Sequence, residues 1–154
     1  MHRFLAISGA LAALALGSCV SHQATLTDGF AWTYQHNEGE GPKLTYGAPM
    51  SDNVVLMMLC EQPGVANVSL LGGSPQGGLI LTSGGQPTRF GGDMVAAPGL
   101  GHMIETSARL DSRPLARFQR TGDLTLVDRG RKVEIDAKGG ERRQVARFFE
   151  ACRA

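Results

Sequence analysis

Residues 54–60 read Val-Val-Leu-Met-Met-Leu-Cys and carry no charged side chain. A short, unbroken apolar run is typical of a strand that is buried on both faces or lies at the centre of a sheet. Asp52-Asn53 precedes the run and Pro63-Gly64 follows it, and these residue types favour turns. The stretch therefore predicts a central β-strand, around which the rest of the fold is arranged.

Shorter apolar or alternating stretches on both sides of this run predict further strands. Glycine makes up 21 of the 154 residues, and glycine-rich turns separate the stretches, which favours many short strands over a helical bundle. Residues 90–101 contain Gly91-Gly92 and Pro98-Gly99 and are expected to be irregular. The predicted strands cover residues 30–34, 44–47, 68–70, 79–82, 103–110, 124–126 and 133–137. The last two are expected to form a hairpin about residues 128–130.

Two segments have helical signals. Asp111-Ser112 with Pro114 in the first turn predicts a short helix that ends before Gly122. In residues 141–152, the apolar side chains recur at the spacing of one helical face; they are Val145, Phe148, Phe149 and Cys152. The predicted fold class is therefore mainly β (α+β): an antiparallel β sandwich or partly closed barrel with a short helix and a C-terminal helix packed on it. Residues 30–154 form one domain.

The first 18 residues have a positive start, an apolar stretch too short to span a bilayer, and a small-residue end. They end in Leu16-Gly17-Ser18-Cys19, which resembles the lipobox of bacterial lipoprotein precursors. The resemblance implies that residues 1–18 are a cleaved signal peptide, that Cys19 is lipidated, and that residues 19–29 are a short tether. It places the domain in the cell envelope, facing the periplasm. Val20 in place of Asp favours the outer membrane over the inner one.

Lipidation of Cys19 would leave two cysteines, Cys60 and Cys152. The exported compartment is oxidising, so a disulfide between them is the natural expectation. The alternatives are two free buried thiols or a redox pair, although no Cys-x-x-Cys spacing supports the latter.

Charge is divided unevenly along the chain. Residues 19–108 hold two Lys or Arg and seven Asp or Glu, whereas residues 109–154 hold twelve and seven. Mutual compensation of the two halves within one fold is the favoured interpretation. The alternative is a basic surface that faces anionic lipid or polysaccharide. The envelope location excludes nucleic acid as a partner.

Motifs for catalysis or metal binding are weak. Gly72-Gly73-Ser74-Pro75-Gln76 lacks the last glycine of a Gly-x-Ser-x-Gly elbow, and no glycine cluster is followed by the lysine of a phosphate loop. The histidine and carboxylates of residues 36–40 favour a solvated loop over a weak metal site. Thioethers can bind soft metals, but core packing is the favoured interpretation of Met57, Met58, Met94 and Met103. We expect no catalytic residue, no metal site and no cofactor.

Several short segments resemble a group of small uncharacterised exported proteins of alphaproteobacteria. They include Ala31-Trp32-Thr33-Tyr34, Tyr46-Gly47-Ala48-Pro49, the strand ending in Cys60, Leu81-Thr82-Ser83, residues 114–126 and residues 148–153. The resemblance implies no particular activity. The favoured function is a non-catalytic envelope lipoprotein that binds a protein or glycan partner.

A second resemblance is to periplasmic lysozyme inhibitors, which insert a loop into the lysozyme cleft. The corresponding binding loop would comprise Ser83, Gly84, Gly85 and Phe90, although the tyrosine of those inhibitors is missing. A lysozyme-type inhibitor is therefore the alternative function, and a small hydrolase is the least favoured.

Overall fold

The computed structural model describes residues 28–73, 78–99, 101–128 and 130–154. The predicted signal peptide, Cys19 and Ser74 lie outside the described residues. The described part contains strands β1 (Ala31–Gln35), β2 (Lys43–Gly47), β3 (Val54–Gln62), β4 (Val65–Leu71), β5 (Leu79–Thr82), β6 (Thr88–Phe90), β7 (Asp93–Ala97), β8 (Gly101–Arg109), β9 (Thr125–Asp128) and β10 (Arg131–Glu134), and helices α1 (Arg113–Thr121) and α2 (Glu141–Ala151).

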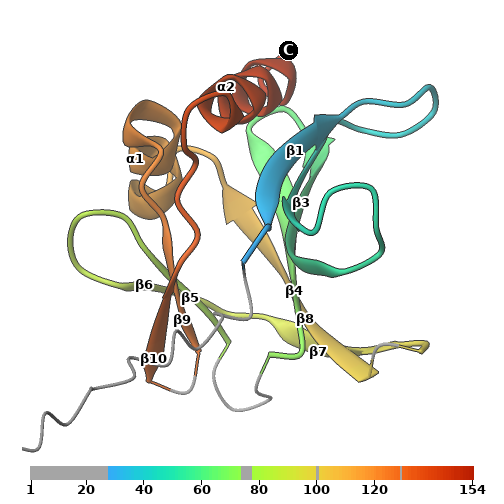
Figure 1. Cartoon of the computed structure of the whole chain (residues 1–154), viewed down its shortest axis with the longest axis vertical. Helices are drawn as coiled ribbons and strands as arrows, with labels where there is room; N and C mark the ends of the chain where they lie inside the picture. Colours follow the sequence, from blue (N-terminus) through green and yellow to red (C-terminus); the bar gives the residue numbers. More distant parts are fainter. Residues whose placement is uncertain (1–27, 74–77, 100, 129) are drawn as a thin grey trace, which may run out of the picture.

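The strands form two antiparallel sheets (Figure 1). The larger sheet has the order β1-β2-β3-β4-β8-β7, and the smaller one has the order β10-β9-β5-β6. Consecutive strands pair directly in most places, as expected where short turns join antiparallel neighbours. The predicted class, mainly β with a sandwich-like arrangement and two helices, is confirmed.

The core lies between the two sheets and the helices. Successive side chains of a strand point to opposite faces. Leu56 and Met58 of β3 therefore face inward and are fully buried. Met57 and Leu59 face outward and are half-buried, whereas Val55, beside the irregularity in the pairing with β2, packs against the core. The apolar run at residues 54–60 thus marks the centre of a sheet rather than a strand covered on both faces.

The two helices lie side by side at the top of Figure 1, and α2 contacts β1 and β2. α2 buries Val145, Phe148 and Phe149, as its spacing predicts. α1 packs through Phe118, whose ring centroid lies 5.0 Å from that of Trp32 on β1. The helices therefore cover the inner face of the larger sheet at its β1 end.

The irregular structure expected for residues 90–101 is wrong, because this segment contains the edge strand β7. Only Val95 and Ala97 in β7 are even partly buried, so the strand lacks the apolar signal of a central strand. Position 92, directly before β7, needs a glycine for the chain to come this close to β8. A Cβ atom there would lie 2.7 Å from the carbonyl oxygen of Glu105. Pairing with β8 therefore decides the conformation of this segment.

In the described ranges, no helix is long and apolar enough to cross a membrane.

Candidate functional site

A groove of about 570 Å³ crosses the outer face of the larger sheet. The outward side chains of Met57, Leu71 and Met103 line it, from β3, β4 and β8. Met57 is opposite Ser69 of β4, and Leu71 is opposite Met103 of β8, so the sheet register places these apolar side chains on one face. Thr33 and Thr45 extend the lining onto β1 and β2. The groove is therefore an apolar surface with polar hydroxyl groups toward one side.

The loop between β2 and β3 contributes Met50 to the same groove. The Met50 side chain is fully exposed, and its backbone has a φ of 58°, which is uncommon for a residue other than glycine. The loop is nevertheless well hydrogen-bonded: the Ala48 N–H donates to the Asn53 carbonyl at 2.9 Å, and the Ser51 hydroxyl donates to the Ala48 carbonyl at 3.0 Å. An ordered loop therefore holds an apolar side chain in solvent beside an apolar groove.

The interpretation of the methionines as core residues is only partly right. Met58 is fully buried, but Met57 and Met103 are half-buried and line the groove. Met94 is exposed on β7. An apolar run predicts a strand but does not say which of its faces another layer covers, so the sequence could not separate Met57 from Met58.

A second groove, of about 480 Å³, lies on the same outer face toward β7 and is acidic. Glu61, Asp93 and Glu105 line it. The Asn67 amide donates a hydrogen bond to the Glu61 carboxylate at 3.2 Å. No group of three histidine, cysteine or acidic side chains in the described residues is arranged to hold a metal ion. The acidic groove is therefore a polar surface next to the methionine-lined one.

The residues predicted as a binding loop do not lie together as one exposed loop. Ser83 is 6 % exposed, and its hydroxyl has no hydrogen-bond partner among the described residues. Gly84 and Gly85 are exposed, and Gly84 packs so closely on α1 that a Cβ atom there would lie 2.3 Å from the Arg117 Nε. Phe90 lies in β6 and packs against the core. This arrangement leaves no aromatic side chain projecting from the loop.

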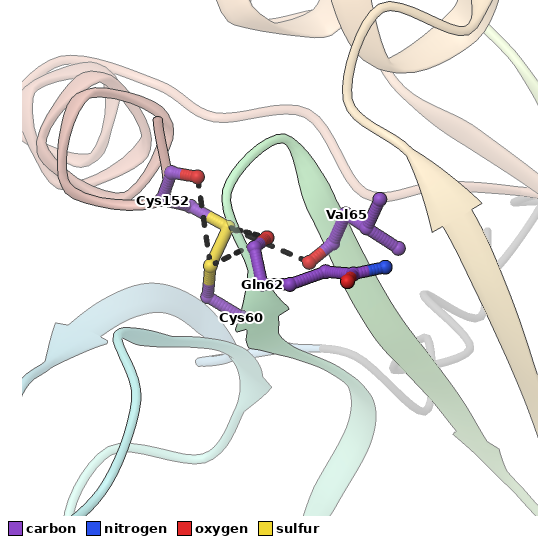
Figure 2. Close-up of a disulfide and its surroundings, with 4 residues drawn as sticks. All are labelled: Cys60, Gln62, Val65 and Cys152. Atoms are coloured by element: carbon purple, nitrogen blue, oxygen red, sulfur yellow. Dashed lines mark hydrogen bonds between the residues drawn. A yellow bond between two sulfur atoms is a disulfide. The ribbon is translucent and has the colours of Figure 1, made fainter. Parts of the chain in front are cut away.

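Cys60 and Cys152 form the disulfide that the sequence favours, with their Cα atoms 5.5 Å apart (Figure 2). The Gln62 carbonyl oxygen lies 3.5 Å from the Cys60 sulfur. The Val65 carbonyl oxygen lies 3.7 Å from the Cys152 sulfur. Beside the bridge, the Gly64 N–H donates to the Cys152 carbonyl at 2.7 Å. The end of α2 is thus fixed to the turn between β3 and β4 by a covalent bond and a hydrogen bond.

Three ion pairs between described residues are local. They are Lys43–Glu40 at 3.0 Å, Arg109–Asp111 at 2.6 Å and Arg131–Asp128 at 3.8 Å. The hydrogen bonds from Lys43 and from Arg109 lower the pKa of the Glu40 and Asp111 carboxyl groups, respectively. Each of these three pairs joins residues no more than three positions apart in the chain. Compensation of the two halves within one fold, the favoured interpretation of the charge pattern, stays a prediction.

The two histidines in the described part lie apart and give no sign of a catalytic pair. His36 follows β1 and His102 lies in β8, both side chains are exposed, and neither takes part in a hydrogen bond within the described residues. Comparison of the chain with protein-family models, with curated proteins and with solved structures found no match. The two outer-face grooves and the distribution of charge are therefore the features on which a functional proposal can rest.

Proposed function

We propose that this chain is an exported lipoprotein, anchored by lipid on Cys19, that binds a protein partner in the cell envelope without catalysing a reaction. The observation that carries the binding role is the methionine-lined groove, in which the exposed Met50 faces solvent beside Met57 and Met103. Methionine is enriched in protein interfaces, and its flexible, polarizable side chain adapts to varied apolar partners. The groove already has the size of a typical ligand site.

A protein partner is favoured over a glycan by the chemistry of the groove. A glycan presents many hydroxyl groups, which need polar partners when they are buried. Polar side chains such as Thr33 and Thr45 line only one side of the groove, and Met57, Leu71 and Met103 offer no polar partner. The aromatic residues Trp32 and Tyr46, which could stack on a sugar ring, are buried in the core. An apolar side chain of a protein partner matches this lining better.

A pull-down from detergent-solubilised envelopes tests the binding role. A glutamate in place of Met57 would put a charge in the groove and should abolish capture of the partner. Met94→Glu is the matched control, because Met94 is exposed on β7 and lines neither groove. Thermal unfolding of both variants verifies that they fold. A partner captured equally well by Met57→Glu and Met94→Glu would show that the groove is not the binding site.

The lipid anchor is supported by Leu16-Gly17-Ser18-Cys19 and by the pairing of the other two cysteines, which leaves Cys19 as the odd one. Two or more acyl chains on Cys19 would give stable anchoring, since one chain binds a membrane only marginally. Labelled palmitate should be incorporated into the native chain and not into Cys19→Ser. We propose the periplasmic face of the outer membrane as its place.

A further inference from the structure

The helices carry a dense set of positive side chains. α1 has no acidic residue, and α2 has only Glu141 and Glu150. The basic residues are Arg113, Arg117 and Arg120 on α1 and Arg142, Arg143 and Arg147 on α2, which we call the arginine surface. Five of the six are exposed and Arg117 is half-buried.

None of these six arginines forms an ion pair with a carboxylate within the described residues. The Arg120 side chain donates a hydrogen bond to the Ala116 carbonyl at 3.0 Å. The Arg142 side chain donates to the Arg120 carbonyl at 2.8 Å. Arg147 lies over the ring of Tyr34 at 4.8 Å. The interactions of these three residues hold their side chains on the surface without neutralising them, so the positive charge remains available to an external anion.

The arginine surface and the acidic groove lie on opposite sides of the larger sheet. The helices pack on its inner face, where Phe118 contacts Trp32, whereas Glu61 and Glu105 line the groove on its outer face. A negative surface would repel the face with Glu61 and Glu105 and attract the face with the helices. The charge distribution therefore favours one orientation of the domain at an anionic surface.

We propose that the arginine surface docks on anionic phospholipid headgroups of the membrane that holds the chain. This inference rests on the proposed lipid anchor at Cys19. Residues 20–27 separate Cys19 from the described domain, and eight residues reach at most about 28 Å. The described chain begins at the end of β1 that points away from α2 (Figure 1). β1 has five residues and is therefore about 17 Å long, which is shorter than the reach of the tether, so the anchor can lie in the same membrane that the arginine surface contacts. Polybasic surfaces close to an anchor strengthen binding to anionic membranes.

Vesicle co-sedimentation tests the proposal without the leader or the lipid. Residues 28–154 contain every described strand and helix, the whole described core and the disulfide, so this segment holds what its fold needs. It should bind vesicles of phosphatidylcholine with phosphatidylglycerol, and it should not bind vesicles of phosphatidylcholine alone. Added salt should weaken the binding, because exposed charges are screened.

Two variants of equal charge locate the contact. The side chains of Arg113 and Arg143 are exposed and make no hydrogen bond among the described residues, so R113Q/R143Q changes charge and leaves the packing intact. Each basic residue near an anionic surface contributes about fivefold, so this variant should lose about 25-fold in vesicle affinity. R131Q/K132Q removes the same charge from β10 and should lose less than about twofold, because distant charges are screened.

Equal losses in the two variants would overturn the proposal, since binding would then depend on total charge alone. Much tighter binding of the same segment to heparin than to the anionic vesicles, at equal charge concentration, would also overturn it, in favour of an anionic polysaccharide as the partner. The proposed anchor and the proposed docking surface are tested by separate experiments. Absent palmitate labelling refutes the anchor alone, whereas absent vesicle binding by residues 28–154 refutes the docking surface alone.

Discussion

At the scale of single residues, Trp32 joins three parts of the molecule. It belongs to β1, its ring lies 5.0 Å from Phe118 of α1, and its Nε1–H donates to the Ile135 carbonyl at 2.6 Å. The indole is 2 % exposed, so its hydrogen bond is shielded from water. A buried tryptophan normally packs its apolar ring in the core while its N–H group donates to a hydrogen-bond acceptor, as here.

Trp32→Phe should therefore destabilise the domain. The phenyl ring cannot donate, so the buried Ile135 carbonyl loses its partner, at a cost of roughly 1–3 kcal/mol. Tyr34→Phe is the matched control, because its hydroxyl has no partner among the described residues and Arg147 can still stack on the ring. Urea unfolding measures both variants. A Trp32→Phe midpoint equal to that of Tyr34→Phe would contradict the role given to the indole.

The exposed ion pair between Arg109 and Asp111 should make a pH-dependent contribution to stability. The hydrogen bond from Arg109 lowers the pKa of Asp111 below its ordinary value of about 3.9. The stabilisation from this pair is therefore present above that value and is lost as the pH falls through the lowered pKa. An NMR titration of Asp111 should show the low midpoint, and Arg109→Gln should raise it. Arg153→Gln should raise it less, because Arg153 makes the weakest contribution to the shift.

At the scale of elements, the sequence predicts regular structure best where packing and local pattern agree. The strand at residues 54–60, the strand before α1 and the apolar face of α2 are found where their spacing places them. β7 could not be predicted, because its residues are mostly exposed and its pairing partner decides its conformation. Edge strands are in general harder to predict from sequence, since one of their sides has no neighbouring strand.

The end of α1 depends on a glycine. Gly122 has a φ of 81°, and its N–H donates to the Phe118 carbonyl at 2.8 Å. A Cβ atom at this position would lie 2.7 Å from the Ala137 carbonyl oxygen. Gly122→Ala should therefore cost about 1–2 kcal/mol for the left-handed backbone, and more for the displaced carbonyl.

Gly130 provides the comparison for Gly122. Its φ is 76°, but a Cβ atom there would meet nothing within 4 Å. Gly130→Ala should therefore show the backbone cost alone, and the difference between the two variants in urea unfolding isolates the contact with Ala137. If Gly130→Ala proves as damaging as Gly122→Ala, the close contact is not what requires a glycine at position 122.

At the scale of the whole molecule, the disulfide joins residues 92 positions apart and should contribute substantially to stability. A loop of this length corresponds to about 4–5 kcal/mol in the chain-entropy description. A reductant should therefore lower the urea midpoint of the native domain and leave that of Cys60→Ala/Cys152→Ala unchanged. The same midpoint for the native domain with and without reductant would refute the contribution.

The candidate groove could not have been predicted from the sequence, because it exists only through the register of the larger sheet. Met57 and Met103 are 46 positions apart, and β4 lies between their strands. Met50 shares the groove because its loop is folded over the outer face. The arginine surface was easier to foresee, since its residues are clustered in the second half of the chain. The sequence did not show that these charges remain unpaired.

The pairing of Cys60 with Cys152 also sets an order of events during biogenesis. On the proposed export route, Cys60 reaches the periplasm long before its partner and must remain a thiol while the next 92 residues follow. Cys19 arrives earlier still and is the nearest wrong partner. Attachment of lipid to the Cys19 sulfur would remove that thiol from competition, so acylation of Cys19 would protect the domain behind it from a wrong disulfide during oxidative folding.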